Sequence, residues 1–119
     1  MDIAPVEIRY YQTTSKRRPF QKWLDSLDTT LQQIVAVRLA RIRRGLFGDA
    51  EPVGEGVFEL KIDVGPGYRM YYGRDEKIMV VLLHAGKKKC QPSDIKKAQA
   101  FWHDYLWRRK DEIIDQDVC

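Results

Sequence analysis

The hydrophobic and polar positions in the first half of the chain predict one strand followed by two helices. Residues 6–12, "VEIRYYQ", alternate in polarity and favour a strand. Pro19 suits the first turn of a helix in "PFQKWLDSL", whose apolar residues recur on one face. A second helix over roughly residues 30–45 has its own apolar stripe, with Asp28 or Thr29 as its N-cap. The two helices therefore form a helical hairpin that covers an apolar surface.

The second half of the chain predicts three successive strands and a last helix. "LFGDAEPVGEG" is rich in Gly, Pro and Asp, which is typical of a loop. Strands are expected at about residues 57–63, 68–74 and 77–84, joined by the turns "VGPG" and "RDEK". The third strand contains "IMVVLL" and is apolar on both faces, as expected of a central strand. The basic segment "GKKKCQPSD" leads to the last helix, which is expected to start near Pro92 with Ser93 or Asp94.

The predicted element order is β-α-α-β-β-β-α. It defines a compact α+β domain with a curved antiparallel sheet, a helical hairpin on one face and a C-terminal helix. The chain has 119 residues, enough for one core, so we expect a single domain over residues 1–110 and an acidic, flexible tail over residues 111–119. Because the tail holds four acidic residues and no basic one, the net charge of +4 for the whole chain corresponds to +8 on residues 1–110.

This basic character fits a polyanionic partner, although a lysine-rich soluble surface would give the same charge. The sequence shows no signal-peptide pattern and no apolar run long enough to span a membrane, so a cytoplasmic protein is expected. The two cysteines form no disulfide framework, and neither histidine has a Cys or His partner at zinc spacing. We therefore expect no metal and no other cofactor.

Two cations on neighbouring strands are the first candidates for chemistry. In a hairpin closed by "VGPG", Lys61 and Arg69 should project from the same face of the sheet. The guanidinium group is a planar fork of donors that suits phosphate oxygens. The structural alternative is a salt bridge from Arg69 to Glu59 or Asp63.

Two further basic clusters could join this pair. Arginines recur at every third position of the second helix and form a cationic ridge, which is also typical of a solvated helix face. Three consecutive lysines occupy the loop after the central strand, where reactive groups tend to be presented, although such a run can simply be a solubilising turn. We expect the three clusters to converge, because the end of strand 77–84 should return beside strand 57–63. The residues are Arg38, Arg41 and Arg44 in the ridge, and Lys87, Lys88 and Lys89 in the loop.

A metal-free cationic site of this kind suits cleavage of RNA. The 2′-hydroxyl of the RNA is the nucleophile, and the protein supplies positive charge for the transition state and a proton for the leaving 5′-oxygen. The same surface would also suit simple binding of RNA or DNA.

The segments "GVFELKIDVGPGYRMYYG" and "KIMVVLLHAGKKKCQPSDIKKAQAFWHDY", together with "PFQKWLDSL" and the Arg-rich second helix, resemble the RelE/ParE superfamily of type II toxin–antitoxin toxins. The closest likeness is to the HigB-like "addiction module killer" branch. The resemblance implies a cytoplasmic toxin neutralised by a cognate antitoxin, which in this branch is usually a helix-turn-helix DNA-binding protein. RelE-like members cleave mRNA on the ribosome, whereas ParE-like members inhibit DNA gyrase.

The resemblance also assigns site residues. Arg69 falls on the strand arginine that contacts the scissile phosphate, Lys88 on a basic residue assigned to transition-state charge or leaving-group protonation, and Lys61 on a basic strand position facing the same site. In two places the sequence departs from RelE. Glu59 stands where RelE has a lysine, and the last helix begins with Asp94 and Ile95 where RelE presents a tyrosine.

His84 ends the central strand, and histidine is the residue type best suited to proton transfer near neutral pH, so His84 is a further catalytic candidate, although a hydrogen-bonded structural imidazole is the alternative. On the last helix, Trp107 is the best candidate for a contact with a partner protein. Three functions therefore stay open: a ribosome-dependent endoribonuclease, an inhibitor of a protein such as gyrase, and a non-catalytic homologue that only binds its antitoxin. Retention of Arg69 with Lys88 favours the nuclease, whose oligomeric state the sequence leaves open.

Overall fold

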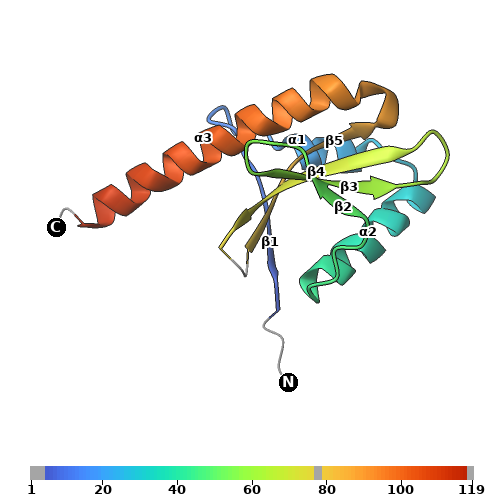
Figure 1. Ribbon diagram of the computed structural model, residues 1–119, viewed down its shortest axis with the longest axis horizontal. Coiled ribbons are helices and arrows are strands. Elements are labelled where there is room, and N and C mark those ends of the chain that lie inside the picture. Colours follow the sequence, from blue (N-terminus) through green and yellow to red (C-terminus); the bar gives the residue numbers. More distant parts are fainter. Residues whose placement is uncertain (1–4, 77–78, 118–119) are drawn as a thin grey trace.

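The computed structural model describes residues 5–76 and 79–117, with side chains described as far as residue 110. The elements alternate between the strands of one sheet and helices that flank it (Figure 1). In chain order they are β1 (Glu7–Tyr10), α1 (Pro19–Asp25), α2 (Thr29–Arg43), β2 (Ala50–Pro52), β3 (Val57–Ile62), β4 (Tyr68–Asp75), β5 (Met79–Lys87), the 3₁₀ helix η1 (Lys88–Cys90) and α3 (Gln91–Asp117). The predicted α+β class and RelE-like arrangement are confirmed.

The five strands form one sheet in the order β1-β5-β4-β3-β2. The pairs β2/β3, β3/β4 and β4/β5 are antiparallel, but β1 runs parallel to β5, so the sheet is mixed rather than wholly antiparallel. The physical reason is the connection that leaves β1. Parallel neighbours need a long crossover, and α1 and α2 lie between β1 and the rest of the sheet in the chain.

Two strand predictions were incomplete. The segment read as a loop contains β2, whose three residues pair with β3, and Pro52 is tolerated there because β2 is an edge strand. Strand β5 runs on to Lys87, so Lys87 ends a strand instead of lying in a loop. The first residues of the predicted strand 77–84 lie outside the described residues.

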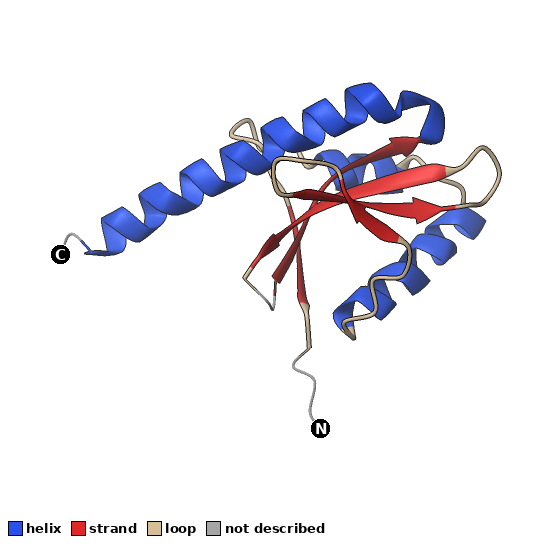
Figure 2. Cartoon of the chain, in the orientation of Figure 1, coloured by secondary structure: helices blue, strands red, loops and turns tan. Residues whose placement is uncertain are grey.

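Helices cover both faces of the sheet (Figure 2). On one face, α1 and α2 supply Phe20, Val35, Leu39 and Ile42 to a core cluster with sheet residues that include Leu60. On the other face, α3 packs on the sheet through buried residues of its own. This second cluster joins Ala98 and Trp102 to Tyr11, Val57, Tyr71, Val81 and Leu83. The prediction that β5 is buried on both faces is therefore confirmed, and the second covering layer is α3.

The helix starts agree with the sequence patterns. The Asp28 side chain caps α2 by accepting the Leu31 backbone N–H at 2.8 Å, and Pro19 begins α1. Helix α3 begins at Gln91, one residue before the predicted Pro92, and continues to Asp117. The helix thus extends into the acidic segment that was expected to be a flexible tail, and the domain boundary at residue 110 stays a prediction. No helix in the described residues is both long and apolar enough to cross a membrane.

Close packing fixes α3 on the sheet. A Cβ atom on Gly73 would lie only 2.4 Å from the Trp102 ring, so the missing side chain of Gly73 makes room for that indole. Further along α3, the Tyr105 hydroxyl donates to Asp75 at 2.8 Å, and Arg109 pairs with the same carboxylate at 2.8 Å. Near the middle of α3, Asp104 accepts from the Tyr11 hydroxyl at 2.6 Å. These contacts hold α3 across the face of the sheet that carries the candidate site.

Candidate functional site

Lys61 and Arg69 are direct cross-strand neighbours on β3 and β4, and Arg69 is in turn opposite Gly86 on β5. Leu60 and Met70 beside them point into the core under α1 and α2. The alternation of side chains therefore places both cations on the other face, which α3 covers. This sidedness confirms the prediction from the hairpin pattern.

Arg69 is held in a buried ion pair. Its Nε atom lies 3.5 Å from Oε1 of Glu59, and the two residues are 5% and 2% exposed. Glu59 is two residues before Lys61 on the same face of β3, so it reaches Arg69 diagonally across the hairpin. Asp63 contributes a longer contact of 3.9 Å to Nη1, which also donates to the Tyr68 carbonyl at 3.1 Å. The salt bridge that was the structural alternative is thus present.

The first turn of α3 reaches the same carboxylate. The side-chain amide of Gln91 donates to Oε2 of Glu59 at 2.6 Å, so Glu59 is held from the sheet by Arg69 and from the helix by Gln91. The Tyr71 hydroxyl is buried beside this pair. Burial, reinforced by the charge of Glu59, raises the pKa of Tyr71 well above its usual value, so this phenol stays protonated.

His84 is paired with Asp94 rather than presented to a substrate. Its Nε2 atom lies 3.0 Å from Oδ1 of Asp94, and its Nδ1 atom is buried. Asp94 reaches this position because Gly86 has no side chain: a Cβ atom there would lie 2.1 Å from Oδ2 of Asp94. The geometry matches the structural alternative for His84, and a catalytic role for this histidine stays a prediction.

Lys88 meets Arg69 at the turn between β3 and β4. The Lys88 backbone N–H donates to the Gly67 carbonyl at 3.0 Å. A Cβ atom on Gly67 would lie 3.4 Å from Cβ of Lys88 and 3.9 Å from Nη1 of Arg69, so the two side chains flank one point. The end of β5 was predicted to lie beside β3, and this is wrong because β4 lies between them. Lys88 nevertheless approaches Arg69, because Arg69 is on β4, the direct neighbour of β5.

The other basic residues predicted for the site lie on opposite faces of the sheet. Lys87, Lys88 and Lys89 are exposed where β5 ends, beside the site. Lys61 is partly exposed and pairs with Glu51 at 3.6 Å. The ridge consists of Arg38 and Arg41 in α2 and Arg44 at its C-cap, and α2 packs on the opposite face of the sheet. The prediction that all three clusters converge is therefore wrong for the ridge.

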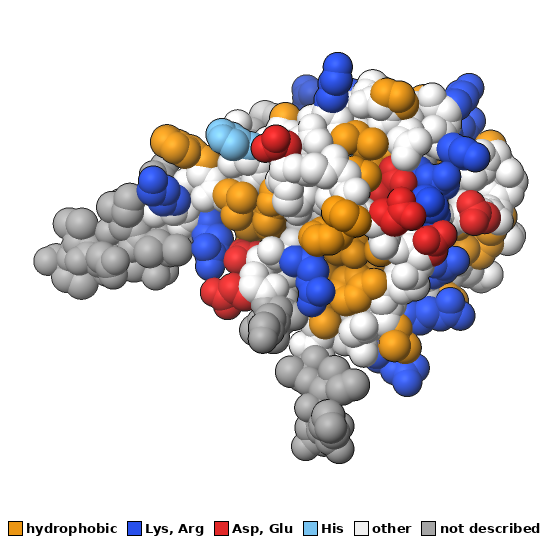
Figure 3. Space-filling model, viewed as in Figure 1, with side chains coloured by type: hydrophobic (Ala, Val, Ile, Leu, Met, Phe, Trp, Pro, Cys, Tyr) orange, Lys and Arg blue, Asp and Glu red, His pale blue; other side chains and the backbone are white. Residues whose placement is uncertain are grey.

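Acidic and basic side chains lie side by side over the end of the sheet that carries the turn between β3 and β4 (Figure 3). Charge of both signs therefore lies on the surface at this end of the sheet. Among the residues that the structure describes, no group of three or more His, Cys, Asp and Glu side chains is placed to hold a metal ion.

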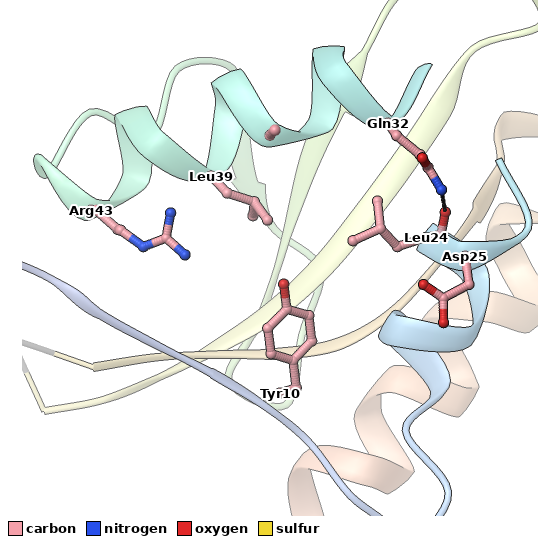
Figure 4. Close-up of a pocket in the computed structure, with 7 residues that line it drawn as sticks. Tyr10, Leu24, Asp25, Gln32, Leu39 and Arg43 are labelled. Carbon is pink, nitrogen blue, oxygen red and sulfur yellow. Dashed lines mark hydrogen bonds between the residues drawn. The ribbon is translucent and has the colours of Figure 1, made fainter. Parts of the chain in front are cut away.

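A cavity of about 380 Å³ lies on the opposite layer, between β1 and the helical hairpin (Figure 4). Tyr10 and Arg43 point into it, and Gln32 at its far end donates to the Leu24 carbonyl at 3.0 Å. It contains none of the residues predicted for chemistry, so the candidate site is the surface around Arg69 and Lys88.

The interactions that the sequence did not predict involve acidic and amide side chains. The sequence offers Glu59 as a possible salt-bridge partner of Arg69, but it does not predict the burial of Glu59. Gln91 lies in the segment predicted as a basic loop, and Asp94 is predicted only at the start of the last helix, where RelE presents a tyrosine. The available signal was the period-2 spacing of Glu59 and Lys61, which places both on the same face as Arg69.

A mixed sheet with a helical hairpin on one face and a long C-terminal helix on the other is the arrangement of a RelE-like fold. Residues 22–101 match the family described as "Phage derived protein Gp49-like (DUF891)". The chain is also 40% identical, over 81 residues, to an uncharacterized protein of Haemophilus influenzae, and the match covers 67% of this chain and 82% of that protein. The chain therefore belongs to the Gp49-like family of phage-derived proteins, which is part of the RelE/ParE-like toxin superfamily. This family is one of toxin–antitoxin toxins, so a cognate antitoxin is the implied partner.

Proposed function

We propose that this protein is a HigB-like toxin of a type II toxin–antitoxin system that cleaves mRNA on the ribosome and thereby stops translation. The toxin–antitoxin family supports the first part of this proposal, and the arrangement of cations at one end of the sheet supports the second. The antitoxin, expected to be a helix-turn-helix protein, neutralises the activity.

The observation that carries the proposal is that three segments of the chain place basic residues at one end of the sheet. Lys61 and Arg69 are cross-strand partners, and Lys88 flanks the same Gly67 position as the Arg69 guanidinium. Rigid strands and a short 3₁₀ helix hold all three, which suits a site that must fix one phosphate. Such a site stabilises the extra negative charge that develops when the 2′-hydroxyl attacks the phosphate.

The proposed roles follow from position. Arg69 binds the scissile phosphate, and Lys88, which is exposed, either stabilises the transition state or protonates the leaving 5′-oxygen. Lys61 faces the same phosphate, while Lys87 and Lys89 contact the flanking backbone of the RNA. A site with so few groups benefits from the ribosome, which supplies the orientation of the mRNA.

The test is inducible expression followed by primer extension on a translated reporter mRNA. Wild type is expected to stop growth and to produce cuts within the reading frame. Lys88→Ala should reduce the cuts at least tenfold, because the loss of one charged contact to the transition state raises the barrier by about 1.4 kcal/mol or more. Lys22→Ala is the matched control, because Lys22 is an exposed lysine on α1, away from the site. Growth arrest without cuts would contradict the proposal and point to a protein target such as gyrase.

A further inference from the structure

Arg69 already has an anionic partner before any RNA is bound. Oε1 of Glu59 lies 3.5 Å from Nε of Arg69, and both residues are almost fully buried. A guanidinium group that is paired in this way has less attraction left for a phosphate. We infer that Glu59 is a positioning residue that competes with phosphate for Arg69, so that the pair regulates access to the site.

The strength of this competition comes from burial. Asp63 also contacts Arg69, but its side chain is 80% exposed and water screens its charge. The Glu59 side chain is only 2% exposed, so its attraction for Arg69 is screened far less. Glu59 is therefore the group that a substrate phosphate has to replace as the main partner of the guanidinium.

Helix α3 participates in the competition through Gln91. The amide of Gln91 donates to Oε2 of Glu59 at 2.6 Å, while Oε1 faces Arg69. Because each oxygen has its own partner, the carboxylate is fixed in the orientation that serves Arg69. Lys88 lies in η1, which directly precedes Gln91 in the chain, so the segment that fixes Glu59 also carries the second cation of the site.

Two properties follow. With Glu59 held in this position, the affinity of Arg69 for a free phosphate group is lowered. A displacement of the first turn of α3 that breaks the Gln91–Glu59 hydrogen bond would free the carboxylate and raise that affinity. The inference rests on the proposed function only for the identity of the ligand as a phosphate.

The experiment measures thermal unfolding of the purified protein at increasing concentrations of inorganic phosphate, with total ionic strength held constant by chloride. A ligand at free concentration L that binds only the folded state stabilises it by RT ln(1 + L/Kd), so at the same phosphate concentration a tighter-binding variant shows a larger rise in unfolding temperature. Glu59→Gln keeps the size and a hydrogen-bond acceptor for Gln91 but removes the charge. It is expected to bind phosphate on the order of tenfold more tightly than wild type, which corresponds to about 1.4 kcal/mol.

Two variants separate competition from a purely structural role. Glu59→Asp keeps the negative charge but withdraws the carboxylate from Arg69 and Gln91, so its affinity for phosphate should lie between those of wild type and Glu59→Gln. Glu59→Gln combined with Arg69→Gln lacks the cation and should lose the gain. A structural role alone would lower the unfolding temperature of Glu59→Gln in buffer without changing its rise with phosphate.

Equal rises with phosphate in wild type and Glu59→Gln would overturn the inference, as would a gain that persists without Arg69. These measurements need no ribosome, antitoxin or mRNA. A protein that fails to cut mRNA in cells can therefore still confirm the competition, and a protein that cuts mRNA can still refute it.

Discussion

Substitution of Arg69 by alanine is expected to destabilise the protein strongly, independently of any catalytic role. The side chains of Arg69 and Glu59 are 6% and 2% exposed, so Arg69→Ala leaves a carboxylate without its counter-charge in a nearly dry site. Breaking a buried ion pair by removal of one partner costs about 3–5 kcal/mol. The contact with the exposed Asp63 adds little, since exposed pairs contribute roughly 0–1 kcal/mol. The lost bond to the Tyr68 carbonyl adds about 1 kcal/mol.

We therefore expect Arg69→Ala to lower the free energy of unfolding by about 4 kcal/mol, out of a total of about 5–15 kcal/mol for an ordinary domain. Urea unfolding of the purified variant at pH 7, followed by far-ultraviolet circular dichroism, measures this loss. Glu59→Gln combined with Arg69→Met removes both charges and should recover at least half of it, because no unpaired charge stays buried. Lys22→Ala is the control and should lie within about 0.5 kcal/mol of wild type.

The reasoning is refuted if Arg69→Ala unfolds within about 0.5 kcal/mol of wild type, or if the double variant is no more stable than the single one. The result also decides how growth experiments are read. Loss of toxicity in Arg69→Ala would reflect unfolding as much as chemistry, which is why Lys88→Ala, at an exposed position, is the better functional variant.

Three further predictions concern the elements that support the site. Gly73→Ala places a Cβ atom 2.4 Å from the Trp102 ring and should cost about 1–3 kcal/mol in urea unfolding, with a smaller cost when Trp102 is first shortened to leucine. Burial and the hydrogen bond to Asp104 raise the pKa of Tyr11 to about 12. Because the folded state holds the phenol proton more tightly than the unfolded state does, the stabilisation from Tyr11 is complete below pH 10 and is lost as the pH rises towards 12. An ultraviolet titration of the folded protein at alkaline pH measures this pKa. Asp28→Ala removes the N-cap of α2 and should cost about 1 kcal/mol in the same urea assay.

The sequence predicted those features that short-range geometry controls. A tight turn sets the register of its hairpin, so the same-face placement of Lys61 and Arg69 followed from the spacing alone. Helix caps and apolar stripes depend on residues a few positions apart, and Asp28 and Pro19 lie where their chemistry requires.

Features that depend on distant partners were not predicted. The direction of β1 depends on how the helical hairpin crosses the sheet, and no residue of β1 encodes it. The burial of Glu59 depends on α3, which lies more than thirty residues further along the chain, because Gln91 and the rest of that helix close over it. The pairing of His84 with Asp94 likewise requires α3 to pack on Gly86.

The buried pair changes how the candidate site is understood. A cationic site on a toxin fold would ordinarily be expected to present its arginine to the substrate, yet here Glu59 holds Arg69 in a buried pair while Lys87, Lys88 and Lys89 are exposed. In the proposed nuclease, exposed lysines therefore contact the RNA, and a buried arginine paired with Glu59 binds the scissile phosphate. This division suits a toxin that acts only when its substrate is positioned by a large partner.

The most direct measurement of the central claim is cleavage of a defined mRNA by the purified protein in a reconstituted translation reaction, with and without ribosomes, followed by mapping of the 5′ ends. The account predicts discrete cuts within the reading frame only when ribosomes translate the message, and a loss of those cuts in Lys88→Ala but not in Lys22→Ala. The account would be contradicted if the mRNA stayed intact on translating ribosomes although expression of the same protein in cells stopped growth.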